Sequence, residues 1–282
     1  MIRPRCTGAV ALLLALAAPL GAQDTGRRLS GKFLLRFHPP AGARYGVVQE
    51  QDVRVDSDSG PSGDLMAQHM RTRMYSVREV TGPVAGGIAV ATRIDSAVAE
   101  AVLPTGGTHR EEMGQLRGAA GRLVYDERMR LVRADFADAS LAENLQAFDV
   151  AAFPAKAVGR GDSWDEALAV SLELPGLNEP VTLRTRMTLR DVRLDGGDTT
   201  VVITLGFRMP DDPLAVRDGE ARFAMTLTGE WTGELEYSLT RGATVAMSVG
   251  GTIHVKIENR DLLAQPIAMR MDQRLSQRLI VP

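Results

Sequence analysis

The sequence predicts a mainly β fold built on a long, curved antiparallel sheet, and three observations carry this prediction. In residues 221–239, apolar side chains occupy most odd positions, while threonine and glutamate occupy most even ones. Such period-two alternation indicates a strand with one apolar and one polar face. The same alternation recurs in residues 181–209, 243–257 and 267–279. Glycine-containing turns such as Asp195-Gly196-Gly197 separate these stretches, as is typical of hairpins.

The central stretch also predicts curvature. At about 3.3 Å per residue, residues 221–239 would extend roughly 60 Å, several times the length of an ordinary strand. Strand twist disfavours a flat strand of that length, and Gly229 and Gly233 are natural positions for a bend or a bulge. The curved sheet can form a half-barrel or a sandwich-like pair of sheets, and the sequence leaves both forms open.

An internal sequence repeat predicts two duplicated β-meanders. Residues 116–125 and 227–237 share a Leu-Gly-Gly-Leu-Tyr pattern, with one extra residue in the second copy. We therefore expect a first half at residues 23–153 and a second half at residues 154–282.

In the first half, alternation predicts strands within residues 33–37, 45–55, 88–94 and 123–131. The second of these places polar Gln49 and Gln51 among valines of the same parity.

One short helix is expected near residues 141–150. Ser140 and Glu143 form a capping box, and Leu141, Leu145 and Phe148 follow at helical spacing.

The second half is regular enough to predict strand register, because the apolar faces of neighbouring strands must coincide. The expected cross-strand pairs are Leu189 with Ile203, Arg193 with Thr199, Leu235 with Met247, Trp231 with Gly251, and Tyr237 with Val245.

The N-terminus predicts export. Basic residues precede an apolar run, and small residues end at Ala22, which is the layout of a signal peptide at residues 1–22. Cleavage removes Cys6, the only cysteine, and leaves no transmembrane segment. Without Arg3 and Arg5, 31 basic residues face 35 acidic ones, a net charge near −4. This balance argues against nucleic acid or an anionic membrane surface as the main partner.

No motif predicts catalysis, a metal site or a cofactor. Met66, Met70 and Met74 lie near His69 and can either bind copper or pack in a core, and we expect packing. On the polar face, His254 is expected opposite Thr228 and diagonal to Glu230, as an ordinary surface contact. A hydrolase that uses two carboxylates stays a distant alternative, because the fold sets their geometry.

The apolar face of the sheet is the remaining candidate for function. Its four central residues, Leu227, Trp231, Leu235 and Met247, are the predicted wall for an apolar ligand such as a lipid or acyl chain. Self-burial, which would make the same residues an ordinary core, is the interpretation that we rank first. We expect an exported, non-catalytic envelope protein that binds an apolar small molecule or a partner protein.

The segments Gly42-Ala-Arg-Tyr45, residues 116–125 and Phe153-Pro154 with Gly161-Asp-Ser-Trp164 resemble a family of uncharacterised exported bacterial proteins. This resemblance spans most of the mature chain and implies no activity and no functional residues. The layout is also similar to the periplasmic lipoprotein-carrier half-barrels, whose curved sheet shields an acyl chain under a helical lid. That likeness is one of architecture only. A carrier for lipids or lipoproteins is the sharper version of the expected function.

Overall fold

The structure is a computed structural model that describes residues 27–57, 68–102, 106–137, 141, 145, 151–170, 181–210, 212–218, 221–258 and 266–280. Most of these residues lie in antiparallel strands, which confirms the mainly β prediction.

The strands of the first half are β1 (Arg27–Arg28), β2 (Lys32–Phe33), β3 (Arg44–Ser57), β4 (Gln68–Val84), β5 (Gly87–Val102), β6 (Thr108–Glu112), β7 (Ala120–Tyr125) and β8 (Leu131–Phe136). A short 3-10 helix, Gly114–Leu116, lies between β6 and β7. The second half contributes β9 (Val158–Gly159), β10 (Ser163–Val170), β11 (Val181–Asp195), β12 (Asp198–Arg208), β13 (Leu214–Asp218), β14 (Ala221–Ser238), β15 (Ala243–Glu258) and β16 (Ile267–Ile280).

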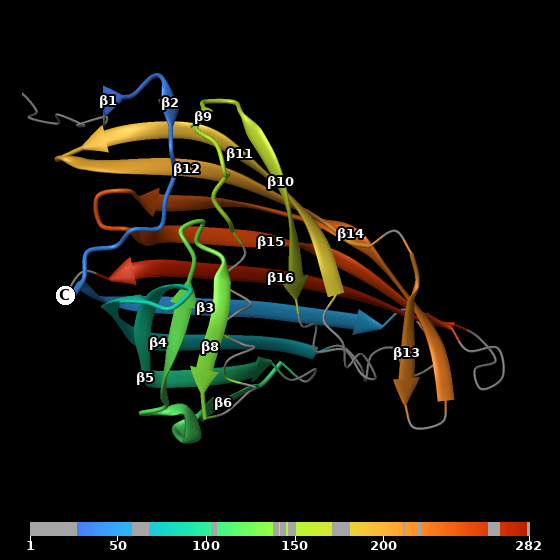
Figure 1. The fold of residues 1–282 in the computed structure, drawn as a ribbon. Coiled ribbons are helices and arrows are strands. Elements are labelled where there is room, and N and C mark those ends of the chain that lie inside the picture. The colour runs from blue at the N-terminus through green and yellow to red at the C-terminus, as the bar shows by residue number, and fades with distance from the viewer. Residues whose placement is uncertain are drawn as a thin grey trace, which may run out of the picture.

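Fourteen of these strands form one sheet (Figure 1). Its order is β1-β11-β12-β14-β15-β16-β3-β4-β5-β7-β8, with β10, β13 and β6 paired at its margins. Strand β16 pairs with β3, so the two halves of the chain join into one continuous sheet. Among the described residues no pairing joins β8 to β1 or β10, so the sheet stays open. Of the two forms left open by the sequence, the structure has the half-barrel-like one.

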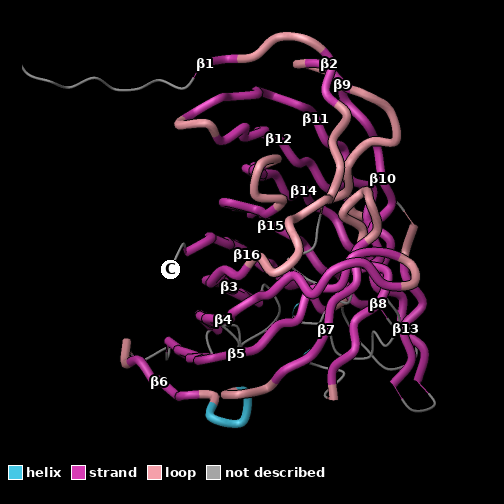
Figure 2. Tube along the Cα trace, turned by 60° about the vertical axis from the view of Figure 1, so that its left-hand side comes forward, coloured by secondary structure: helices cyan, strands magenta, loops and turns pink. Residues whose placement is uncertain are grey.

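The sheet curves around a core that lies on one face, here called the apolar face (Figure 2). This face carries the odd-numbered residues of β14, while Thr228, Glu230 and Thr232 lie on the opposite, polar face. Alternation in the sequence therefore predicts correctly which side chains are buried along this strand.

Two irregular segments, residues 29–40 and 151–162, cross the apolar face and are here called the cover (Figure 1). Within the cover, Phe33 pairs with Val158 in the two-residue strands β2 and β9. Leu35, Phe37 and Phe153 are each at most 5% exposed and belong to the same core cluster as the sheet. Burial against β14 and its neighbours therefore holds the cover in place.

Only part of the expected helix is described. Leu141 and Leu145 have helical backbone, and their buried side chains pack against Met74, Ile94 and Ala97 on β4 and β5. The other residues of 141–150 lie outside the described part of the chain.

Two strand predictions are wrong in detail. Residues 34–37 are not in a strand, although Leu35 and Phe37 are buried and Leu34 is exposed, as alternation predicts. Residues 123–131 are two strands, because a turn with Met129 at φ 62° separates β7 from β8.

The predicted register holds in the middle of each hairpin and fails near the turns. Leu189 with Ile203, Leu235 with Met247, and Trp231 with Gly251 are confirmed. Bulges at Arg190 and Val245 shift the remaining pairs, so that Arg193 faces Thr200 and Tyr237 faces Thr244. Each bulge adds one residue to one strand, and a parity argument cannot detect it.

Candidate functional site

The structure brings the four predicted wall residues together in one core cluster. Leu227, Trp231, Leu235 and Met247 are 1–5% exposed, and Leu235 lies directly opposite Met247. The Trp231 ring stacks edge-on against Phe207 on β12, with the ring centres 6.5 Å apart. The wall is therefore buried in the structure, as the self-burial interpretation requires.

Chain segments outside the large sheet provide part of that covering. The ring of Phe153 packs edge-on against Tyr237 with centres 4.8 Å apart. The backbone N–H of Phe153 donates to the carbonyl of Arg128 (2.7 Å), and the indole N–H of Trp164 donates to the carbonyl of Ala152 (2.8 Å). Arg128 also forms an ion pair with Glu166 on β10. These contacts link the turn between β7 and β8 to β10 across the open side of the sheet.

Next to the wall, the apolar face carries buried polar side chains. Gln277 lies opposite Met247, and the amide of Gln49 donates to the Gln277 side-chain oxygen at 3.3 Å. Ser76 and Thr92 continue this patch on β4 and β5 at 0% and 2% exposure, and their hydroxyls have no hydrogen-bond partner in the described structure. Buried polar atoms of this kind are normally satisfied by a partner, a water or a ligand.

The sequence itself carries a signal for this patch. Gln49 stands where the parity of β3 requires an apolar residue, and its partner Gln277 stands in the same position on β16. Polar residues on an otherwise apolar face indicate a constraint other than simple core packing.

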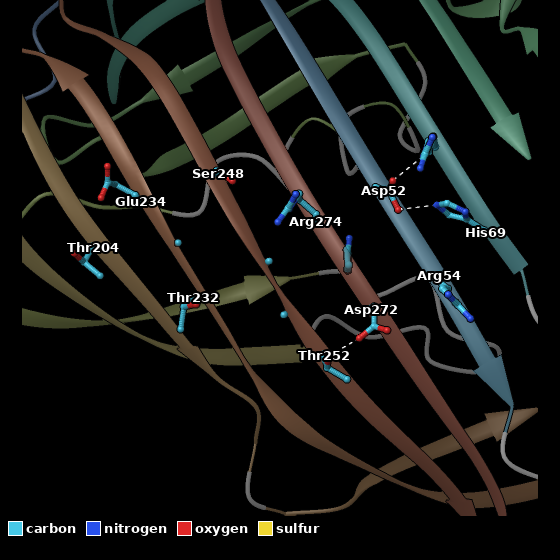
Figure 3. Close-up of a pocket in the computed structure, with 15 residues that line it drawn as sticks. Asp52, Arg54, His69, Thr204, Thr232, Glu234, Ser248, Thr252, Asp272 and Arg274 are labelled. Atoms are coloured by element: carbon cyan, nitrogen blue, oxygen red, sulfur yellow. Dashed lines mark hydrogen bonds and ion pairs between the residues drawn. The ribbon is translucent and has the colours of Figure 1, made fainter. Parts of the chain in front are cut away.

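The polar face carries a separate, open hollow of about 980 Å³ that extends over β12, β14, β15, β16, β3 and β4 (Figure 3). Apart from Glu234 on β14, small residues line it on the β12–β15 side: Thr204, Thr232, Gly233, Ser248, Gly250, Gly251 and Thr252. Longer charged side chains line it on the β16–β4 side: Asp272, Arg274, Asp52, Arg54, His69 and Arg71. This difference in side-chain length across neighbouring strands makes the hollow.

The carboxylates of this hollow are already paired. Asp52 accepts hydrogen bonds from Arg71 (2.8 Å) and lies 2.9 Å from His69 (Figure 3). Burial alone would raise the pKa of Asp52, but the hydrogen bonds from Arg71 and His69 outweigh it and hold the pKa below its usual value. A hydrogen bond from Thr252, helped by one from Arg270, likewise lowers the pKa of Asp272.

Two further hollows adjoin the sheet. One of about 410 Å³ lies over β3–β6 and shares Asp52, Arg71 and Arg274 with the large hollow. The other, of about 710 Å³, lies over β10, β11, β12 and β14 and includes Phe207 and Trp231 in its lining. Thus one of the four wall residues borders a hollow.

The polar face also carries the predicted contact of His254. His254 faces Thr228 as predicted, and both it and Glu230 are exposed. The described residues contain no group of three or more His, Cys, Asp or Glu side chains that could hold a metal ion. Met66, the first residue of the copper alternative, lies outside the described residues. No helix in the described part of the chain has the length and apolar character needed to cross a bilayer.

Comparison with known proteins adds no assignment: no protein-family model matches the chain, and no curated protein is significantly similar to it.

Proposed function

We propose that this chain is an exported, non-catalytic binding protein that takes an apolar ligand, such as a lipid acyl chain, onto the apolar face of its sheet. The observation that carries the proposal is the nature of the cover. Irregular segments anchored by aromatic side chains, and not a second large sheet, lie on the face that holds the predicted wall. Such segments have fewer hydrogen bonds to break than a sheet does, so they can move aside more easily.

The dimensions of the wall fit an acyl chain. The eight-residue separation between Leu227 and Leu235 corresponds to about 26 Å of strand. One leaflet of a bilayer core is about 15 Å thick, so the wall exceeds the length of one ordinary acyl chain. A ligand that displaces Phe153 and Phe37 would exchange one set of apolar contacts for another, at low net cost.

The proposal includes the predicted signal peptide, which would deliver the protein to the periplasm or the outside of the cell. A more specific form of the same function is a carrier that passes a lipid or a lipoprotein between partners. The alternative to an apolar ligand is a protein partner that binds on the curved sheet.

Native mass spectrometry with lipid extraction tests the proposal. Mature protein purified from a bacterial envelope should retain an apolar molecule, and the variant Phe153→Ala should retain more because it loosens the cover. The control is Leu34→Ala, which removes a side chain of the cover that is 56% exposed and should not change retention.

A second readout follows the ligand to the wall. In a Trp164→Phe background, the remaining Trp231 should be quenched by a fatty acid that carries a spin label on its chain. Absence of co-purified lipid in the wild type and in Phe153→Ala, together with absence of saturable Trp231 quenching in Trp164→Phe, would contradict the proposal.

A further inference from the structure

We propose a second binding site, on the opposite face of the sheet, that recognises a phosphate group through Arg274. The site lies at the junction of the two hollows that share Asp52, Arg71 and Arg274. It is independent of the apolar ligand, because the side chains that form it point away from the core.

Arg274 differs from the other charged residues of the large hollow in its partners. Arg71 pairs with Asp52 at 2.8 Å, and Arg54 pairs with Asp56 at 3.2 Å. The carboxylate of Glu234 pairs with Arg190.

Arg274, in contrast, makes no hydrogen bond or ion pair with any residue that the structure describes. The charges around it are therefore largely compensated, and one guanidinium remains available in the hollow.

The space beside Arg274 is shaped by a missing side chain. Gly250 lies directly opposite Arg274 on β15, and Thr232 lies opposite Gly250 on β14. Arg274 extends from β16 toward β15, the side on which Gly250 leaves room (Figure 3). Strands are spaced about 4.8 Å apart, so Thr232 and Arg274 flank an opening about 10 Å wide at the backbone. A ligand group can enter this opening and meet the guanidinium from one side.

The chemistry of the lining favours a phosphate group. A guanidinium donates two parallel hydrogen bonds to a phosphate or carboxylate and stays charged at every physiological pH. The hydroxyls of Thr232 and Ser248 line the hollow on the side opposite the guanidinium. A tetrahedral phosphate presents oxygens in both directions at once, whereas a planar carboxylate presents two oxygens along one edge. The whole hollow measures about 980 Å³, which leaves room for the rest of a phosphorylated ligand.

The test uses the mature full-length protein and isothermal titration calorimetry at pH 7.5 and constant ionic strength. The probes are inorganic phosphate, a sugar phosphomonoester, acetate, and vesicles that contain an anionic phospholipid. Phosphate or the phosphomonoester should bind more tightly than acetate, and Arg274→Gln should weaken that binding by about tenfold or more, the loss expected for one charge-assisted hydrogen-bonded pair. Arg278→Gln is the matched control, because Arg278 is exposed on the same face of β16 and lies outside both hollows.

A second variant distinguishes a shaped binding site from an isolated surface charge. Gly250→Thr keeps Arg274 but fills the opening; its Cβ would lie 3.1 Å from the backbone carbonyl oxygen of Gln273 and 3.6 Å from the Cβ of Arg274. It should weaken phosphate binding as Arg274→Gln does. Binding to vesicles alone, lost in both variants, would identify the phosphate as a lipid headgroup, and binding to the soluble probes would identify a free phosphorylated ligand.

The proposal is overturned if no probe binds, if acetate binds as well as phosphate, or if Arg274→Gln and Gly250→Thr bind as the wild type does. None of these results bears on lipid retention at the apolar face, so the two proposals can fail separately.

Discussion

Replacing Gly251 with alanine tests the contact on which the register of the central hairpin depends. Gly251 on β15 lies opposite Trp231 on β14. A Cβ at Gly251 would lie 2.1 Å from the carbonyl oxygen of Glu230 and 2.7 Å from Cδ1 of Trp231. The closer atom belongs to the backbone, so it cannot rotate away as a flexible side chain would.

The two strands would have to separate locally by about 1 Å to restore a normal contact, which strains the hydrogen bonds between them and disturbs the packing of Trp231. Overpacking of this kind costs about 1–3 kcal/mol and occasionally more, and the backbone contact places Gly251→Ala at about 3 kcal/mol. For a domain of this size that loss lowers the melting temperature by about 6–12 °C.

The assay is urea unfolding followed by tryptophan fluorescence and circular dichroism, with Gly206→Ala as the control. Gly206 lies in the neighbouring strand β12, and the nearest atom to an added Cβ there is the Arg186 carbonyl oxygen at 3.8 Å. Alanine at Gly206 should be neutral or stabilising by about 0.5 kcal/mol, because it restricts the unfolded chain. Equal stabilities for Gly251→Ala and Gly206→Ala would refute the pairing of Trp231 with Gly251, and with it the register of the central strands.

Three further predictions concern buried and half-buried polar groups, each measured by urea unfolding. Gln277→Met should destabilise the fold by about 1–3 kcal/mol because it leaves Gln49 buried without its partner. The double variant Gln277→Met/Gln49→Met should recover most of that loss. Additive losses in the double variant would show that the two amides do not interact. Tyr237→Phe should cost nothing or stabilise slightly, because the Tyr237 hydroxyl is buried without a hydrogen-bond partner in the described structure and burial raises its pKa; a clear loss would reveal a partner. Asp52→Asn should destabilise by less than about 1 kcal/mol at pH 7, since solvent screens this two-fifths exposed carboxyl. Because the folded-state pKa of Asp52 is lowered, its contribution is fully present above the unfolded pKa of about 3.9 and is lost as the pH falls through the lower folded-state pKa, so the difference in stability between wild type and Asp52→Asn should shrink as the pH falls below about 4.

Period-two alternation in the sequence was sufficient to predict the fold class and most of the inner and outer positions on the central strands. Trp231, Leu235 and Met247 are buried where parity places them, because a strand can bury only every second side chain. Pairing in the middle of the hairpins also followed from parity, since a slip of one residue would expose a whole apolar face.

The tertiary structure determined the features that the odd–even alternation of residues does not specify. The bulges at Arg190 and Val245 depend on how the sheet twists near its turns, and no local sequence pattern predicts them. The pairing of β16 with β3, which joins the two halves, links residues more than two hundred positions apart. Alternation specifies which face each strand buries, but it does not specify which strand becomes its neighbour.

The same division applies to the candidate sites. The sequence by itself determined that one face of the sheet is apolar and that Leu227, Trp231, Leu235 and Met247 lie on it. Only the folded chain decided that Phe153 and its neighbours would lie over that face, and that Arg274 would face Gly250 across a shared hollow. The physical reason is the sequence separation of the residues involved. The apolar or polar character of a sheet face repeats every two residues along one strand. The cover and the hollow, in contrast, are made by strands and segments that meet only after the whole sheet has formed.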